Sequence, residues 1–190
     1  MTWYTFFKSV HVLAAVVWVG GAFVTQFFAL RVLRSSDRSR QADFAADVEW
    51  IGTRIFMPAS VVVFLAAIGL MVNGGWSWGE LWVVYALIIY AMSFAVGAGF
   101  LGPESGRIAK VIRDEGRASP NATARIRRIL AYSRVELILL LGVIWAMVVK
   151  PTGDSVGWFV AALAVMAVAI ALVVRAFLAG PRLESSPALE

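Results

Sequence analysis

The sequence predicts an all-α integral membrane protein, a polytopic bundle of about five transmembrane helices. Of its 190 residues, 61% are hydrophobic and only 15% are charged, and the mean hydropathy is +0.80. The apolar residues form long runs, which is typical of membrane spans and unlike the short periodic stripes of soluble domains. The basic residues are concentrated in alternate connections between these runs, as the positive-inside rule describes.

Four of the runs are nearly free of charge over a membrane-spanning length, which takes about 20 helical residues for ~30 Å of hydrocarbon. A fifth run, 137–149, has only 13 residues, so its helix must begin near residue 131. This start places Arg134 and Glu136 inside the membrane boundary. The predicted spans of a single bundle over residues 1–182 are 4–33, 55–75, 80–102, 131–150 and 157–180.

The basic residues orient these spans. With five spans, all but two of the 17 lysines and arginines fall on one side of the membrane, and the exceptions are Lys8 and Lys150. Because Lys and Arg accumulate in cytoplasmic loops, we expect the amino terminus outside and the carboxyl terminus in the cytoplasm. Aromatic residues expected at the outer interface, where such rings act as anchors, are Trp3, Tyr4, Trp76, Trp78, Trp82 and Trp158.

The two basic connections, residues 34–54 and 103–130, carry apolar residues at helical spacing. Ser119 followed by Pro120 predicts the start of a helix, since serine is a good N-cap and proline suits the first helical position. Basic amphipathic helices beside a bilayer lie against anionic lipid headgroups. We therefore expect both connections on the cytoplasmic membrane surface, with no nucleic-acid partner. Residues 183–190 are expected to be a tail outside the fold.

The composition limits the chemistry of any site. The chain has no cysteine and one histidine, which excludes thiolate sites and sites built from several histidines of one chain. His11 shares a helix face with Lys8 and lies just inside the outer boundary of the hydrocarbon, where a polar ring needs a partner. Two interpretations stay open: a metal ligand or proton-handling group, and a histidine hydrogen-bonded to a neighbouring helix or to interfacial water.

Two further pairs of residues are candidates for a site. Met71 and Met147 are expected at the depth of His11, where their thioethers would either complete a haem or copper site or fill gaps in the packing. Arg31 and Glu136 are expected near the cytoplasmic ends of their helices. Since a carboxylate inside a membrane is normally paired or protonated, we expect an interhelical ion pair, with a proton or substrate relay as the alternative.

The run from His11 to Gly21, HVLAAVVWVGG, resembles the first helix of CopD-like bacterial membrane proteins. That group includes the copper-resistance protein CopD, HemJ-type protoporphyrinogen oxidases and integral membrane proteins of unknown function, which the whole chain resembles most. The resemblance implies a bacterial inner membrane and, from the HemJ-type members, haem b bound at His11. The chain lacks the second histidine after Arg31 and the lysine near the start of the third helix, which argues against protoporphyrinogen oxidation.

Three classes of function therefore stay open. The first is a protein that binds haem b, or less favourably copper, with His11, Lys8, Met71 and Met147 at the site. The second is a transport or lipid-interacting protein without a cofactor, and the third is a scaffold acting through its basic segments. No reaction follows from these residues, so the sequence does not establish an enzyme. Small residues along the third and last spans permit close helix packing within the bundle or in a homo-oligomer.

Overall fold

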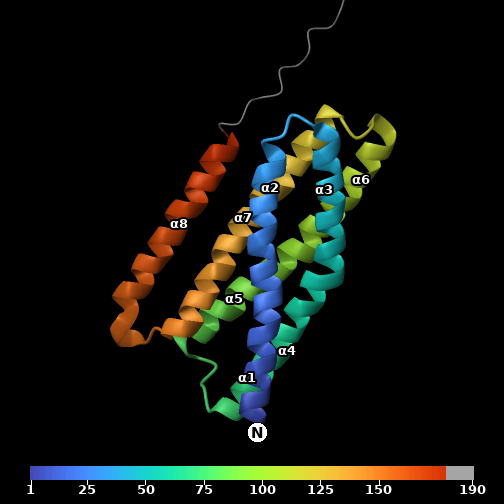
Figure 1. Ribbon diagram of the computed structural model, residues 1–190. Coiled ribbons are helices and arrows are strands. Elements are labelled where there is room, and N and C mark those ends of the chain that lie inside the picture. Colours follow the sequence, from blue (N-terminus) through green and yellow to red (C-terminus); the bar gives the residue numbers. More distant parts are fainter. Residues whose placement is uncertain (179–190) are drawn as a thin grey trace, which may run out of the picture.

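The computed structural model describes residues 1–178 and confirms the all-α membrane bundle, with five long helices running antiparallel to their neighbours in sequence (Figure 1). The predicted tail, Arg182 and the end of the last predicted span lie outside the described residues. The helical segments are α1 (Trp3–Ala15), α2 (Gly21–Leu33), α3 (Arg38–Ile51), α4 (Met57–Gly74), α5 (Leu81–Val96), α6 (Gly102–Glu115), α7 (Pro120–Val149) and α8 (Val156–Leu178).

Three of the five helices contain a π-helical turn: Val16–Gly20 joins α1 to α2, Gly52–Phe56 joins α3 to α4, and Gly97–Leu101 joins α5 to α6. Each pair is thus one continuous helix, of 31, 37 and 35 residues respectively. At about 1.5 Å per residue these helices are roughly 45–55 Å long. They extend well beyond the ~30 Å of hydrocarbon that a span must cross.

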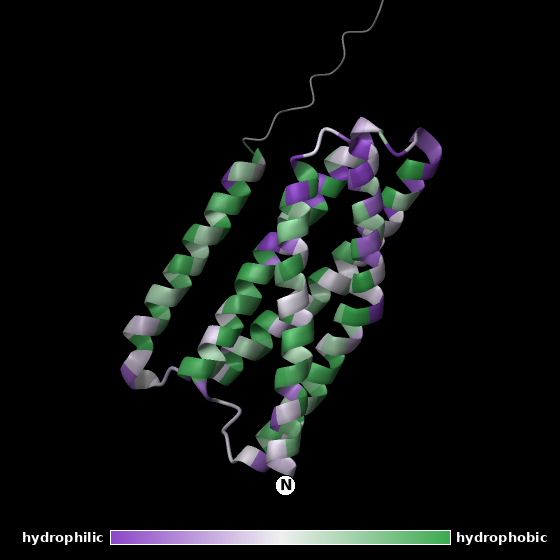
Figure 2. Ribbon diagram, viewed as in Figure 1, coloured by the Kyte–Doolittle hydropathy of each residue, from purple (hydrophilic) through white to green (hydrophobic). Residues whose placement is uncertain are grey.

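The basic connections, predicted to lie along the membrane surface, instead prolong the spans. Residues of α2, α3, α6 and α7 enclose an apolar core here, formed by Ala29, Ala42, Ile108, Ile126 and Leu130. The apolar stripes of these helices are shielded from water more completely by one another than by lipid headgroups, which cover one side only. We call this the basic end, and Figure 2 shows hydrophilic residues gathered around it.

A buried carboxylate lies within the basic end. Glu104 is 4% exposed, and its oxygens accept hydrogen bonds from Nη1 of Arg125 at 2.6 Å and Nη1 of Arg107 at 3.2 Å. The side chain of Ser119 caps α7 and Pro120 occupies its first turn, which confirms the predicted helix start. The ion pair between Glu104 and Arg125 joins α6 to α7 and fixes their register, whereas the pair with Arg107 lies within α6.

The membrane-spanning parts pack through small residues, as is common for helices in lipid. A Cβ atom at Gly69 of α4 would lie 2.5 Å from the Phe7 ring of α1, so α1 and α4 approach closely. Gly142 of α7 has the same role toward Met166 of α8. α8 packs mainly against α7 and also touches α5, where the Tyr85 ring meets that of Phe159 at 5.3 Å. It lies at the side of the bundle in Figure 1.

The opposite end of the bundle, which we call the aromatic end, holds the connections 75–80 and 150–155. Gly75 ends α4 with φ 68° and Lys150 ends α7 with φ 49°, a left-handed conformation that few residues other than glycine adopt. Trp3 and Trp158 are 70% and 75% exposed, consistent with interfacial anchors.

Cysteine labelling should establish the orientation of the bundle. The chain has no native cysteine, and Ser77, Asp154 and Asp114 are exposed. We predict that cysteines at 77 and 154 react with a membrane-impermeant thiol reagent in intact cells, because the positive-inside rule predicts that the basic end, which carries residue 114, faces the cytoplasm. A cysteine at 114 should react only after the membrane is opened. Labelling of residue 114 in intact cells would reverse the assigned orientation.

Candidate functional site

His11 lies on the bundle-facing side of α1 and is 9% exposed. Its Nδ1 is 3.0 Å from the backbone carbonyl oxygen of Val63 on α4. Because a carbonyl only accepts hydrogen bonds, Nδ1 carries a proton, and in the neutral ring Nε2 then presents a lone pair. The structure thus contains the hydrogen bond to a neighbouring helix that the packing interpretation of His11 requires. It also leaves Nε2 available as a metal ligand or a proton-handling group.

A cavity of about 240 Å³ opens beside this ring, between α1, α4, α5 and α7. The four residues proposed from the sequence all line it: Lys8, His11, Met71 and Met147. Met71 is buried and Met147 half-buried. Most other lining groups are aromatic or aliphatic, and the aromatic ones are Tyr4, Trp18, Phe64, Trp76, Trp78, Trp82 and Tyr90.

Two lysines line the cavity at the aromatic end of the bundle. Besides Lys8, Lys150 lines it, with Nζ 3.7 Å from the centre of the Trp76 ring and 5.4 Å from that of Trp82. The two indoles meet edge to face at 5.5 Å. Trp76 and Trp82, predicted only as interfacial anchors, therefore also form the cavity wall, and their π faces hold the lysine ammonium group in place.

An aromatic cluster closes the inner end of this cavity. The rings of Phe64 and Tyr90 stack at 5.0 Å, and Trp18 meets Tyr90 edge-on at 6.0 Å. The Tyr90 hydroxyl donates to the backbone carbonyl of Ser60 at 3.2 Å. These contacts join the turn Val16–Gly20, α4 and α5. We call Trp18, Phe64 and Tyr90 the aromatic partition.

Beyond the partition, toward the basic end, lies a second cavity of about 260 Å³. Trp18 and Leu140 line both cavities. Glu136 of α7 faces the second one and accepts a 2.5 Å hydrogen bond from the Ser93 hydroxyl of α5. All three π-helical turns contribute to its wall, so the helices depart from regular α geometry where they surround this space.

The structure does not bring Arg31 and Glu136 together. Ion pairs within residues 1–178 join Glu104 to Arg107 and Arg125, and Asp43 to Arg117. Arg31 is exposed, because it follows Gln26, which faces the bundle, by five residues, or about 140° around the helix. Arg134 reaches α2 instead, and its Nε donates to Gln26 Oε1 at 3.3 Å.

Two site residues escaped prediction for different reasons. Lys150 had a usable signal, a lysine directly before a proline at the outer end of a span. Ser93 had none, since a serine in an apolar span gains meaning only once α5 is known to pack against α7. Groups of three or more metal-ligating His, Cys, Asp or Glu side chains are absent from the described part of the chain.

Comparison with known proteins identifies one family model, described as predicted integral membrane protein (DUF2269), that matches residues 5–151. The match runs from α1 to the end of α7, so it includes all lining residues of both cavities except Tyr4 and excludes α8. No curated protein and no solved structure matches the chain.

Proposed function

Since the chain belongs to the DUF2269 family of predicted integral membrane proteins, we propose that it is a multi-pass protein of the bacterial inner membrane that binds haem b at His11. The observation that carries this proposal is the hydrogen bond between His11 Nδ1 and the Val63 carbonyl. Histidines that ligate metals generally donate their other ring N–H to a carbonyl or carboxylate, which fixes the tautomer and aims the ligand nitrogen.

The other groups of the cavity suit a flat apolar macrocycle. Its walls are largely aromatic and aliphatic, and Met71 and Met147 offer a thioether as a second axial ligand. At about 240 Å³ the enclosed volume is below the range of roughly 300–1,000 Å³ that is typical of small-molecule sites. The cavity is partly open, so a larger ligand would extend beyond the enclosed volume. A bound haem would supply a one-electron couple whose potential depends on its axial ligands.

The two lysines complete the fit. Lys8 is exposed and Lys150 is half-buried, and both line the cavity near the aromatic end. A propionate is a carboxylate, and ammonium groups form charge-assisted hydrogen bonds with carboxylates. We expect the macrocycle to be oriented with its propionates toward this end and its apolar edge against the aromatic partition.

Copper is the second candidate, favoured by the presence of both methionines on the same cavity as His11. Imidazole and thioether groups are ligands that suit Cu(I). This alternative uses the same histidine but leaves no role for the lysines. A cofactor-free transport or lipid-interacting protein is the third alternative, in which His11 only joins α1 to α4.

The absorption spectrum and metal content of purified full-length protein test the proposal. Protein prepared with haem available should show a Soret band and about one iron per chain. Copper at a similar ratio without a Soret band would favour the second candidate. Protein that takes up neither metal after reconstitution with each would overturn both and leave His11 a packing residue.

A further inference from the structure

The second cavity differs from the first in its charge. Its lining includes the carboxylates of Glu49 and Glu136 but no lysine, arginine or histidine. This is unexpected at the basic end of a chain whose net charge is +5. Within the described residues Ser93 is the one hydrogen-bond partner of the Glu136 carboxylate, and Glu49 forms no ion pair.

Arg134 is not among the residues that line the cavity. Arg134 precedes Glu136 on α7 by two residues and is turned toward α2, where it donates to Gln26. Gln26 itself lines the cavity, whereas Arg134 does not. A ligand in the cavity would therefore meet the carboxylates of Glu49 and Glu136 and the amide of Gln26, but no cationic side chain of the lining.

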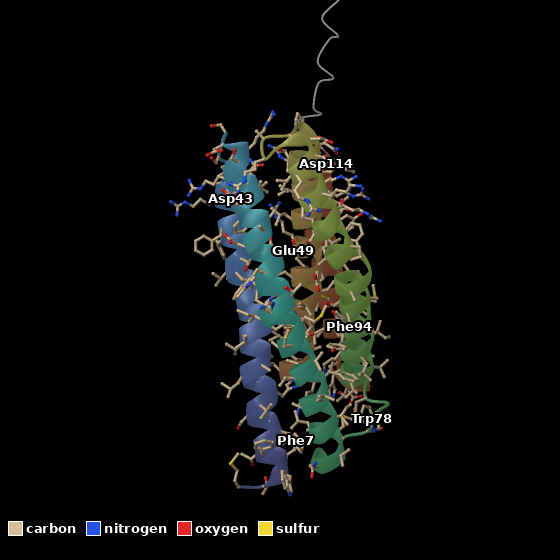
Figure 3. All side chains as sticks on the ribbon, turned by 90° about the vertical axis from the view of Figure 1, so that its right-hand side faces the viewer. Phe7, Asp43, Glu49, Trp78, Phe94 and Asp114 are labelled. Carbon is tan, nitrogen blue, oxygen red and sulfur yellow. The ribbon has the colours of Figure 1, made fainter. Side chains whose placement is uncertain are left out.

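The cavity opens sideways between α4 and α5. Met57 and Phe94 line it although they are 42% and 46% exposed, so the wall is incomplete where they lie. Figure 3 views this side and shows Phe94 and Glu49 along the gap between the α3–α4 and α5–α6 helices. Phe94 is 13 residues from the start of α5, about 20 Å along the helix, so the opening faces hydrocarbon.

The remaining lining is mostly apolar, with small residues at the π-helical turns. Gly52, Gly97 and Ala98 belong to two of these turns, and a Cβ atom added at either glycine would meet nothing within 4 Å. The cavity thus has room for an apolar body entering from the bilayer. Ionisable residues within a membrane that face a cavity commonly mark a path or site for a charged species.

We propose that this cavity binds a lipophilic cation, with its apolar body between α4 and α5 and its charge against Glu136. The opening between α4 and α5 admits such a molecule from the lipid, where amphiphilic cations concentrate. The carboxylate of Glu136 then gains the cationic partner that no described residue provides. The site is separated from His11 by the aromatic partition, so the proposal does not depend on haem binding.

Tetraphenylphosphonium and tetraphenylborate provide the test, because they share size and shape and differ in the sign of their charge. Equilibrium dialysis with full-length protein in an uncharged detergent should show saturable binding of about one phosphonium per chain. Borate should bind at least tenfold more weakly. Glu136→Gln should weaken phosphonium binding at least tenfold, whereas Asp43→Asn, which removes an exposed carboxylate outside the cavity, should leave it unchanged.

A second variant keeps the test decisive if Glu136→Gln does not fold. Gly97→Phe adds bulk where the structure has space and should abolish phosphonium binding without removing a charge. Equal binding of the two ions would show an apolar cavity without charge selection, and preference for borate would make Arg134 the dominant group. Either result, or unchanged phosphonium binding by both variants, overturns the proposal.

Discussion

Replacing His11 with alanine should remove essentially all bound haem from a protein that still folds. The chain has one histidine and no cysteine, so no second imidazole or thiolate can replace the lost ligand. The measurement is the ratio of Soret to protein absorbance after purification, with the folded state checked by size-exclusion chromatography. Retention of a full Soret band by the variant would show that His11 is not the ligand.

Matched variants separate ligation from packing. His11→Ala also leaves the Val63 carbonyl without its side-chain partner, at a cost of about 1–3 kcal/mol if that group stays unsatisfied. Met71→Leu and Met147→Leu conserve volume, so each should leave stability nearly unchanged. Only the methionine that provides the second axial ligand should shift the spectrum. Lys8→Ala should weaken haem retention without altering the spectrum of what remains bound.

Removing the Glu104 carboxylate should destabilise the basic end far more than removing an exposed one. The Glu104 side chain is 5% exposed, and its partners Arg125 and Arg107 are 37% and 65% exposed. A hydrogen bond to a charged group contributes about 1.5–3 kcal/mol, and we expect Glu104→Ala to cost an amount in this range. Amide hydrogen exchange should then accelerate in α6 and the first half of α7.

Asp43→Ala is the control for this comparison. Asp43 and Arg117 form an ion pair whose side chains are 54% and 62% exposed, and such exposed pairs contribute about 0.2–1 kcal/mol. Thermal unfolding in the same detergent should separate the two variants clearly. Equal small shifts would mean that the basic end does not form the packed core described above.

The spans and the grouping of Lys8, His11, Met71 and Met147 could be predicted, because hydropathy and depth in the membrane can be read from the sequence. A helix that crosses a membrane has its register fixed by its apolar length, so residues at similar distances from the outer ends meet at one level. Depth alone does not determine which of the side chains at one level are in contact. Glu136 pairs with Ser93 and not with Arg31 because of the order of helices around the bundle, which the sequence does not encode locally.

At the basic end, too, the sequence did not show which surfaces the helices pack against. The apolar residues of 34–54 and 103–130 indicated amphipathic helices correctly, but the choice between lipid headgroups and neighbouring helices as their partner depends on tertiary packing. Two of the three π-helical turns had a signal in the sequence, because Pro58 and Pro103 follow Gly52–Phe56 and Gly97–Leu101. A proline inside a helix has no N–H for the bond to residue i−4 and clashes with that carbonyl, which disturbs the preceding turn. The turn Val16–Gly20 has no proline near it and could not be predicted.

The position of α8 outside the family match has a consequence for how the protein enters the membrane. α7 carries Arg134 and Glu136, and a charged residue at the centre of an inserting helix costs about 2.5–3.5 kcal/mol. The hydrogen-bond partners of Arg134 and Glu136 are Gln26 and Ser93. Both partners belong to helices that are synthesised before α7. α8 is the most apolar of the five spans and the least buried, so it requires no partner for its own insertion. We therefore expect the four spans of the family match to insert cooperatively and α8 to insert independently of them.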